Sequence, residues 1–263
     1  MIIILGLIGV VVGIFSGFTG LGGGILLIPA LLYYFKAQGI LTSYAMQIAG
    51  NTALAVVCCI SLLSSYQHHR HKRIHWQMVR SFLPGLVIGI GCGSVLANRL
   101  NTQALEQSFG LLLLLIVLHL LWPQKKQVDK QQSPPPVIYL ASIITGFLAP
   151  MFGIGGGMLM IPFFHAQGLV FLEAIATSVF CLLPISIISL AANTLLGYLH
   201  HTLALDSIHT IGFLYWPGLL CIVPMSMLST PIGIYLAKKT DTRIIKRVLA
   251  CMILLTAISL LTG

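Results

Sequence analysis

The chain of 263 residues is 57% hydrophobic and 7% charged, and it carries a net charge of +9. This composition excludes an ordinary soluble domain, because several apolar runs exceed the ~18 residues that can cross a bilayer. In a soluble protein the positive charge would suggest nucleic acid. Here the basic residues lie between apolar runs, where they contact membrane lipids and set orientation, so we predict no nucleic-acid partner.

The apolar runs define two halves and a polar linker. Repeat one, residues 1–122, contains apolar segments near 2–19, 24–35, 44–66, 81–98 and 105–122. Residues 123–136 are polar and rich in proline, which is typical of a linker. Repeat two, residues 137–263, contains apolar segments near 137–152, 157–166, 172–198, 211–236 and 244–262. Shorter matches pair 36–39 with 165–168, 68–69 with 200–201, and 84–85 with 217–218. We therefore predict one transmembrane domain over 1–263, an all-α polytopic bundle of two repeats.

A glycine-rich motif occurs once in each half. Gly-Leu-Gly-Gly-Gly at 20–24 returns as Gly-Ile-Gly-Gly-Gly at 153–157, and a proline follows each copy, at Pro29 and Pro162. Each glycine costs a helix about 1 kcal/mol relative to alanine, and each proline leaves a carbonyl unpaired. In lipid such groups must be covered by protein or a water-filled cavity. Two matching broken helices therefore indicate a transporter binding site, although such glycines can also serve close helix packing alone.

The positive-inside rule decides whether the chain reverses at the glycine motifs. Without reversal, the 14 lysines and arginines divide evenly between the two sides of the membrane. With reversal, all of them except Lys36 and Arg99 share one side, as the rule expects of a cytoplasmic face. Five elements per half then make the repeats inverted. The linker 123–136 and the loop His68–His75 are expected to be cytoplasmic, and both termini are expected outside.

The segments directly after the glycine motifs are short. Residues 25–35 and 158–166 give helices of roughly 15 Å, about half the thickness of the hydrocarbon core. We therefore predict that each forms a Gly-broken, re-entrant half-helix that pairs with the longer helix before it.

Neutral polar residues are the candidates for a binding site. No lysine, arginine, aspartate or glutamate lies in the middle of an apolar run, so the sequence lacks the buried carboxylate typical of proton-driven cation pumps. It also lacks a nucleophile–base pair and metal-ligand spacing, so we predict no enzyme activity, no cofactor and no metal site. The histidines of 68–75 can form a solvated, lipid-facing surface or, as a weaker alternative, a metal site.

The starts of the half-helices favour an anion. A helix beginning near 23–25, and another near 156–158, would present unpaired N–H groups and the positive end of a helix dipole. Glycine lets an anion approach this backbone closely. The predicted substrate-binding residues are Ser16, Gly22, Gly23, Gly24, Asn51, Thr52, Gly155, Gly156, Gly157, Thr177 and Ser178. Each Ser, Thr or Asn could instead pack or bond to a backbone carbonyl.

The motifs and the length resemble the sulfite exporter TauE/SafE family of membrane permeases, over essentially the whole chain. The resemblance rests on Gly13, Gly17, 20–24 and Pro29, and on their counterparts Gly146, 153–157 and Pro162. The segment 174–178, with Thr177-Ser178, also looks like the family's Ala-rich Thr-Ser stretch. Two departures stand out: the matching place in the first half reads Gly50-Asn51, and Pro150 stands where the first copy has Gly17.

The resemblance implies a secondary transporter of the bacterial inner membrane, working as an exporter by alternating access. Its implied substrates are small anions such as sulfite, sulfoacetate and organosulfonates. A non-transporting membrane scaffold and a passive anion channel are the alternatives. The expected partners are the anion and membrane lipids, and the sequence predicts no particular oligomeric state.

Overall fold

The computed structural model describes residues 2–19, 22–39, 44–121, 134–199, 210–239, 250–251 and 253–260. Its helices are α1 (Ile2–Thr19), α2 (Gly24–Ala37), α3 (Ala45–Arg70), α4 (Trp76–Arg99), α5 (Thr102–Leu121), α6 (Pro135–Phe152), α7 (Gly157–Ala166), α8 (Phe171–Leu199) and α9 (Trp216–Lys239). Residues 250–251 and 253–260 are also helical. Five of the described helices are long and apolar enough to cross a membrane. The predicted all-α polytopic membrane fold is confirmed.

Two predicted boundaries are wrong. The apolar segment 211–236 is not one helix, because a hairpin of β1 (Thr210–Ile211) and β2 (Leu214–Tyr215) precedes α9. Gly212, with φ of 58°, supplies the turn conformation that other residues adopt reluctantly. The linker 123–136 also ends early, because α6 begins at Pro135, a residue type suited to a first helical turn. Residues 122–133 lie outside the described residues.

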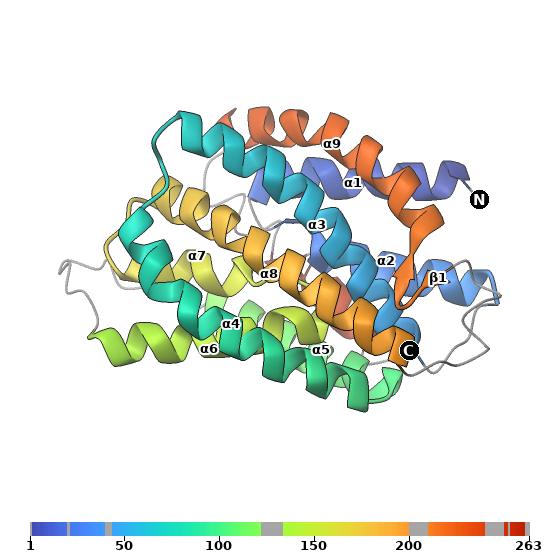
Figure 1. Cartoon of the computed structure of the whole chain (residues 1–263). Coiled ribbons are helices and arrows are strands. Elements are labelled where there is room, and N and C mark those ends of the chain that lie inside the picture. Colours follow the sequence, from blue (N-terminus) through green and yellow to red (C-terminus); the bar gives the residue numbers. More distant parts are fainter. Residues whose placement is uncertain are drawn as a thin grey trace.

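Both helices break at the glycine motifs, as predicted. α1 ends at Thr19 and α2 begins at Gly24, while α6 ends at Phe152 and α7 begins at Gly157. The φ angles of Gly22, Gly23, Gly155 and Gly156 are 80°, 76°, 71° and 81°, in the region that favours glycine. In Figure 1, α1 runs away from the N-terminus and α2 runs back beside it. A half-helix therefore follows each break, with 14 residues in α2 and 10 in α7.

Two closely packed helix pairs enclose the centre of the bundle. α1 packs along α9 and α4 packs along α6, with α3 and α8 between these pairs (Figure 1). Glycines make both contacts close: a Cβ on Gly13 would clash with the backbone oxygen of Ser226, and a Cβ on Gly146 would clash with that of Leu86. Each pair is thus held by the same kind of contact, which suits helix packing in lipid.

The two pairs match in register as well. A Cβ on Gly93 would clash with the carbonyl of Phe147, and a Cβ on Gly233 would clash with that of Ile14. α4 and α9 each have 24 residues and begin with tryptophan, 140 positions apart. The sequence match between 84–85 and 217–218, at a spacing of 133, therefore does not mark equivalent positions, because additional residues that include the hairpin separate α8 from α9.

Candidate functional site

The two glycine turns meet between α3 and α8. A Cβ on Gly24 would lie 2.8 Å from the carbonyl oxygen of Gly153, so the start of α2 touches the other turn. Gly22 and Gly155 both face Val57 and Leu182, which are fully buried. A Cβ on Gly22 would lie 3.2 and 3.3 Å from these side chains, and one on Gly155 would lie 3.1 and 3.0 Å away. Three predicted site glycines, Gly22, Gly24 and Gly155, are therefore near one another.

The half-helices begin with unpaired donors. Gly23 and Gly156 are the N-cap residues, and no side chain caps either helix. Their carbonyls accept hydrogen bonds from 26–27 and 159–160. Within the described chain, the amides of Gly24 and Ile25, and those of 157–158, form no hydrogen bond, although all four residues are buried. Each turn therefore places free N–H groups at the positive end of a helix dipole, as predicted.

Thr52 and Thr177 are engaged by the backbone. The N–H of His75 donates to Oγ1 of Thr177, and the N–H of Tyr215 donates to Oγ1 of Thr52, both at 3.0 Å. His75 and Tyr215 immediately precede α4 and α9, and both threonines are 0% exposed. Since the two bonds match, Thr177 corresponds to Thr52. The sequence match of Thr177-Ser178 to Gly50-Asn51 was therefore out of register.

The hydroxyl groups of Thr52 and Ser178 donate to carbonyls of their own helices. The Thr52 hydroxyl donates to the Ile48 carbonyl at 2.7 Å, and the Ser178 hydroxyl donates to the Ile175 carbonyl at 2.9 Å. Such bonds one turn back along a helix are the usual fate of Ser and Thr in membrane helices. Thr52, Thr177 and Ser178 therefore hold the helices in place in this conformation and leave no hydroxyl proton free for a ligand at Thr52 or Ser178.

A small cavity lies beside the first glycine turn. Its lining, here called the serine cavity, consists of Ser16, Gly22, Ile60, Ser61, Ser64, Val179 and Leu182. The free volume is about 20 Å³, enough for a water molecule. The hydroxyls of Ser16 and Ser64 form no hydrogen bond within the described residues, whereas Ser61 donates to the Cys58 carbonyl. Two free hydroxyls thus face the same space as a glycine of the turn.

The serines of this cavity belong to a repeat that the sequence analysis missed. Ile-Ser-Leu-Leu-Ser at 60–64 of α3 matches Ile-Ser-Ile-Ile-Ser at 185–189 of α8, at the spacing of 125 that also relates Thr52 to Thr177. Ser186 and Ser189 are both 0% exposed, and the Ser189 hydroxyl has no partner. The signal was present, but a search at the spacing of the glycine motif, 133, does not align these serines.

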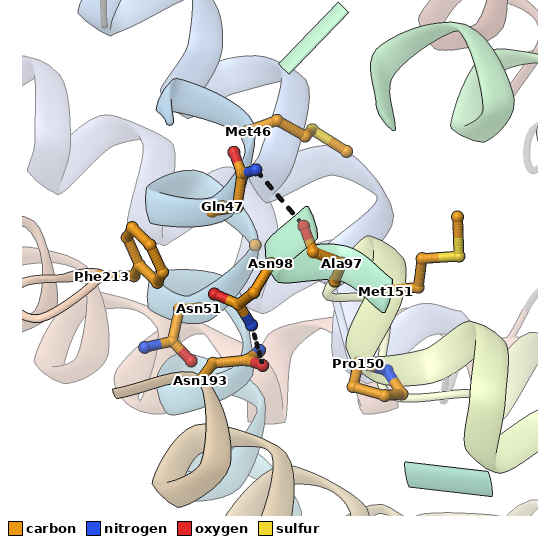
Figure 2. A pocket seen from close by; sticks show the side chains of 10 residues that line it. Met46, Gln47, Asn51, Ala97, Asn98, Pro150, Met151, Asn193 and Phe213 are labelled. Atoms are coloured by element: carbon orange, nitrogen blue, oxygen red, sulfur yellow. Dashed lines mark hydrogen bonds between the residues drawn. The ribbon is translucent and has the colours of Figure 1, made fainter. Parts of the chain in front are cut away.

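Asn51 lies in a second cavity. The lining, here called the amide cavity, comprises Met46, Gln47, Gly50, Asn51, Ala97, Asn98, Pro150, Met151, Asn193 and Phe213 (Figure 2). Asn51 precedes Ser61 by roughly 15 Å along α3, so the two cavities lie at different depths. Between them, Val57 of α3 lies against Gly22 and Gly155 of the two glycine turns. The predicted residues are thus divided between two places.

The histidine loop packs against aromatic side chains. His69 meets Trp76 edge-on, with ring centroids 5.8 Å apart, and Trp76 meets Phe180 at 4.9 Å. In the part of the chain that the structure describes, no group of three His, Cys, Asp or Glu residues could hold a metal ion. The aromatic contacts favour the interfacial interpretation of this loop over the metal site.

Comparison with known proteins decides the family. A family model described as Sulfite exporter TauE/SafE matches residues 5–260. The chain belongs to this family. No solved structure matches this TauE/SafE protein. It is 26% identical to a "Probable membrane transporter protein" of Haemophilus influenzae, over 97% of this chain and 96% of the relative.

Relatives from other lineages carry similar descriptions. The TauE/SafE chain is 29% identical to a probable membrane transporter protein of Methanocaldococcus jannaschii, over 94% of this chain and 90% of the relative. It is 27% identical to the probable membrane transporter protein YunE of Bacillus subtilis, over 98% and 97%. Together with the apolar helices, these matches make the protein an integral membrane transporter and not an enzyme.

Proposed function

We propose that this TauE/SafE protein is a secondary transporter that exports small anions, sulfite or organosulfonates, by alternating access between two inverted repeats. The observation that carries the proposal is the serine cavity at the first glycine turn. Free hydroxyls of Ser16 and Ser64 share this space with Gly22, two residues before the start of α2. Neutral donors at the positive end of a helix suit an oxyanion without a fixed positive side chain.

The second half offers a matching set of donors. Ser186 and Ser189 occupy the positions on α8 that Ser61 and Ser64 occupy on α3, and Ile185 lies beside the N-cap of α7, 3.5 Å from a Cβ built on Gly156. The α1–α9 and α4–α6 contacts also match. These correspondences support two related halves that exchange conformations around a central site, the arrangement expected for alternating access.

The expected orientation of the chain in the membrane supports export. Under the positive-inside rule, the loop after α3 faces the cytoplasm of a bacterial inner membrane, so the serine cavity, near the end of α3, lies toward the cytoplasmic side. An anion loaded there would leave with the help of an internally negative membrane potential, which contributes about 2.3 kcal/mol per charge per 100 mV. The serine cavity has only about 20 Å³ free in this conformation. It must therefore widen when the anion binds.

Anion flux through purified protein in proteoliposomes tests the proposal. Sulfite and sulfoacetate efflux should be saturable, and Ser16→Ala combined with Ser64→Ala should raise KM about 100-fold or more, because hydrogen bonds to charged groups contribute roughly 1.5–3 kcal/mol each. Ser65→Ala is the matched control, since the Ser65 hydroxyl is already bonded to the Val179 carbonyl. Unchanged KM in the double variant would contradict the site. Unsaturable current would indicate the passive channel instead.

Glycine variants are poor tests of binding. Replacing Gly23 by leucine, a natural first choice, combines φ of 76° with a Cβ 2.7 Å from Cγ1 of Val12. Such a variant loses the turn itself, so loss of transport would follow from misfolding. The serine variants leave the backbone intact and separate the two effects.

A further inference from the structure

Four buried amide side chains line the amide cavity. Gln47 and Asn51 come from α3, Asn98 from α4 and Asn193 from α8. Figure 2 shows Asn98 directed at Asn193 and Gln47 directed at Ala97. Their exposed fractions are 8%, 1%, 8% and 6%. Buried amides in a membrane bundle need hydrogen-bond partners, so the question is which of their atoms have none.

The N–H groups of three of these amides, Gln47, Asn51 and Asn98, are already used. Nε2 of Gln47 donates to the carbonyls of Leu100 at 2.7 Å and Ala97 at 3.3 Å. Nδ2 of Asn98 donates to the Ser94 carbonyl at 2.7 Å and to Oδ1 of Asn193 at 3.4 Å. Because a backbone carbonyl only accepts, these contacts fix which atom of Gln47 and of Asn98 is nitrogen.

The atoms without partners are oxygens. Nδ2 of Asn51 donates to Oγ1 of Thr194 at 3.1 Å, which leaves its Oδ1 unpaired. Oδ1 of Asn98 and Oγ of Ser94 are also buried without a partner. A cavity with spare acceptors, in which three of the four amides already donate elsewhere, favours a positively charged ligand over an anion.

The C-terminal end of α6 adds negative potential to the amide cavity. Pro150 and Met151, from the last turn of α6, line the amide cavity, and no basic residue lies in that turn. The C-terminal end of a helix carries partial negative charge, and such ends, together with carbonyl oxygens, coordinate Na⁺ in broken-helix transporters. α6 ends at the second glycine turn, so the cavity lies next to one of the two breaks.

The four amides have no amide counterparts at the equivalent positions of the other half. At the spacing of 125, Gln47 and Asn51 correspond to Leu172 and Ala176, and at 140, Asn98 corresponds to Lys238. Asn193 corresponds to His68. Matching helix contacts in the two halves therefore do not require these amides, which argues against a purely architectural role.

We propose that the amide cavity binds a monovalent alkali cation, for which Na⁺ is the probe. Uncharged oxygen ligands suit a single positive charge, since the described cavity lining contains no carboxylate to offset a second one. The free volume of about 10 Å³ matches one dehydrated ion or one water molecule. This proposal concerns the other cavity and stands independently of the anion.

Thermal unfolding of the purified full chain tests the proposal. NaCl is titrated against choline chloride at constant total chloride, so that anion effects cancel. Na⁺ should raise the apparent Tm saturably. Asn98→Ala should raise the Na⁺ concentration for half of the Tm shift at least tenfold, while Ser226→Ala, a buried serine bonded to the Val223 carbonyl, should leave it unchanged. Equal Tm values in both salts would overturn the proposal, as would an unaltered Na⁺ response in Asn98→Ala.

A direct measurement covers the case in which Asn98→Ala does not fold. Radioactive ²²Na⁺ should bind the wild-type protein saturably and be displaced by unlabelled Na⁺. Asn51→Ala, which removes a different unpaired oxygen, should weaken this binding at least tenfold. Absence of saturable ²²Na⁺ binding to the wild-type protein would mean that the cavity holds only water, and it would overturn the proposal whatever the outcome of the flux experiment.

Discussion

The backbone N–H of Tyr215 donates to the hydroxyl of Thr52 at 3.0 Å, although the two residues are 163 positions apart. The bond fixes the start of α9 against α3, and its counterpart from His75 to Thr177 fixes the start of α4 against α8. These bonds join the central helices to the outer pairs. They give the two threonines an architectural role that their position in the sequence did not reveal.

Removing this hydroxyl should lower stability. Thr52→Val keeps the shape but leaves the Tyr215 N–H unpaired in a buried place, so we expect a loss of about 1–3 kcal/mol and a lower Tm. Thr52→Ser retains the hydroxyl and should lose less. Thermal unfolding of the purified variants measures both. A Thr52→Val protein with wild-type Tm and lost sulfite transport would instead make Thr52 a ligand.

Replacing two glycines of α4 by alanine should change the stability of the protein in opposite directions. A Cβ on Gly93 would clash with the Phe147 carbonyl, whereas a Cβ on Gly91 would meet nothing within 4 Å. Gly93→Ala should therefore destabilise the α4–α6 contact by about 1–3 kcal/mol. Gly91→Ala should be neutral or stabilising by up to about 1 kcal/mol, because alanine favours helix. Tm values of the two variants check this pair, and equal losses would argue against the close α4–α6 packing.

The half-helix turns should tolerate alanine less than an exposed turn does. Gly39 and Gly156 both have positive φ, 71° and 81°, but only Gly156 is crowded, with Cγ2 of Thr145 at 2.8 Å from a built Cβ. Gly39→Ala should cost about 1–2 kcal/mol for the left-handed backbone alone. Gly156→Ala should cost more. Denaturation in detergent provides the comparison, and a smaller loss in Gly156→Ala would mean that the turn is loosely packed.

Cysteine labelling should establish the sidedness of the chain. With the six native cysteines replaced, Lys72→Cys in the loop before α4 should react with a membrane-impermeant maleimide only from the cytoplasm. Lys239→Cys, at the end of α9, should also react only from the cytoplasm. Labelling of the two positions from opposite sides would refute the inverted arrangement, because without the reversal at the second glycine motif they would lie on opposite faces.

The glycine-turn breaks could be predicted because consecutive glycines and a nearby proline act locally, through the backbone. The serine repeat and the pairing of Thr52 with Thr177 could not be recognised at a fixed spacing, since the spacing between equivalent residues changes along the chain. α2 is four residues longer than α7, and the connection from α8 to α9 is longer than that from α3 to α4. The matching hydrogen bonds of Thr52 and Thr177 establish the new register.

The hairpin was missed for a different reason. Residues 211–236 read as one apolar run, and two-residue strands leave almost no periodic pattern. Its position depends on close approach to α8: a Cβ on Gly212 would lie 2.6 Å from the Thr194 carbonyl, and one on Gly197 would lie 2.9 Å from the Phe213 ring. Both contacts join residues distant in sequence, so no local rule could supply them.

The hairpin also bears on the direction of transport. Phe213 forms a wall of the amide cavity, and the five residues between α3 and α4 include no strand that could take its place in the first half. Two identical halves would give inward-open and outward-open forms of equal energy. Because one form must move an aromatic plug that its mirror image does not possess, we expect the resting population to be biased toward one orientation even without a gradient.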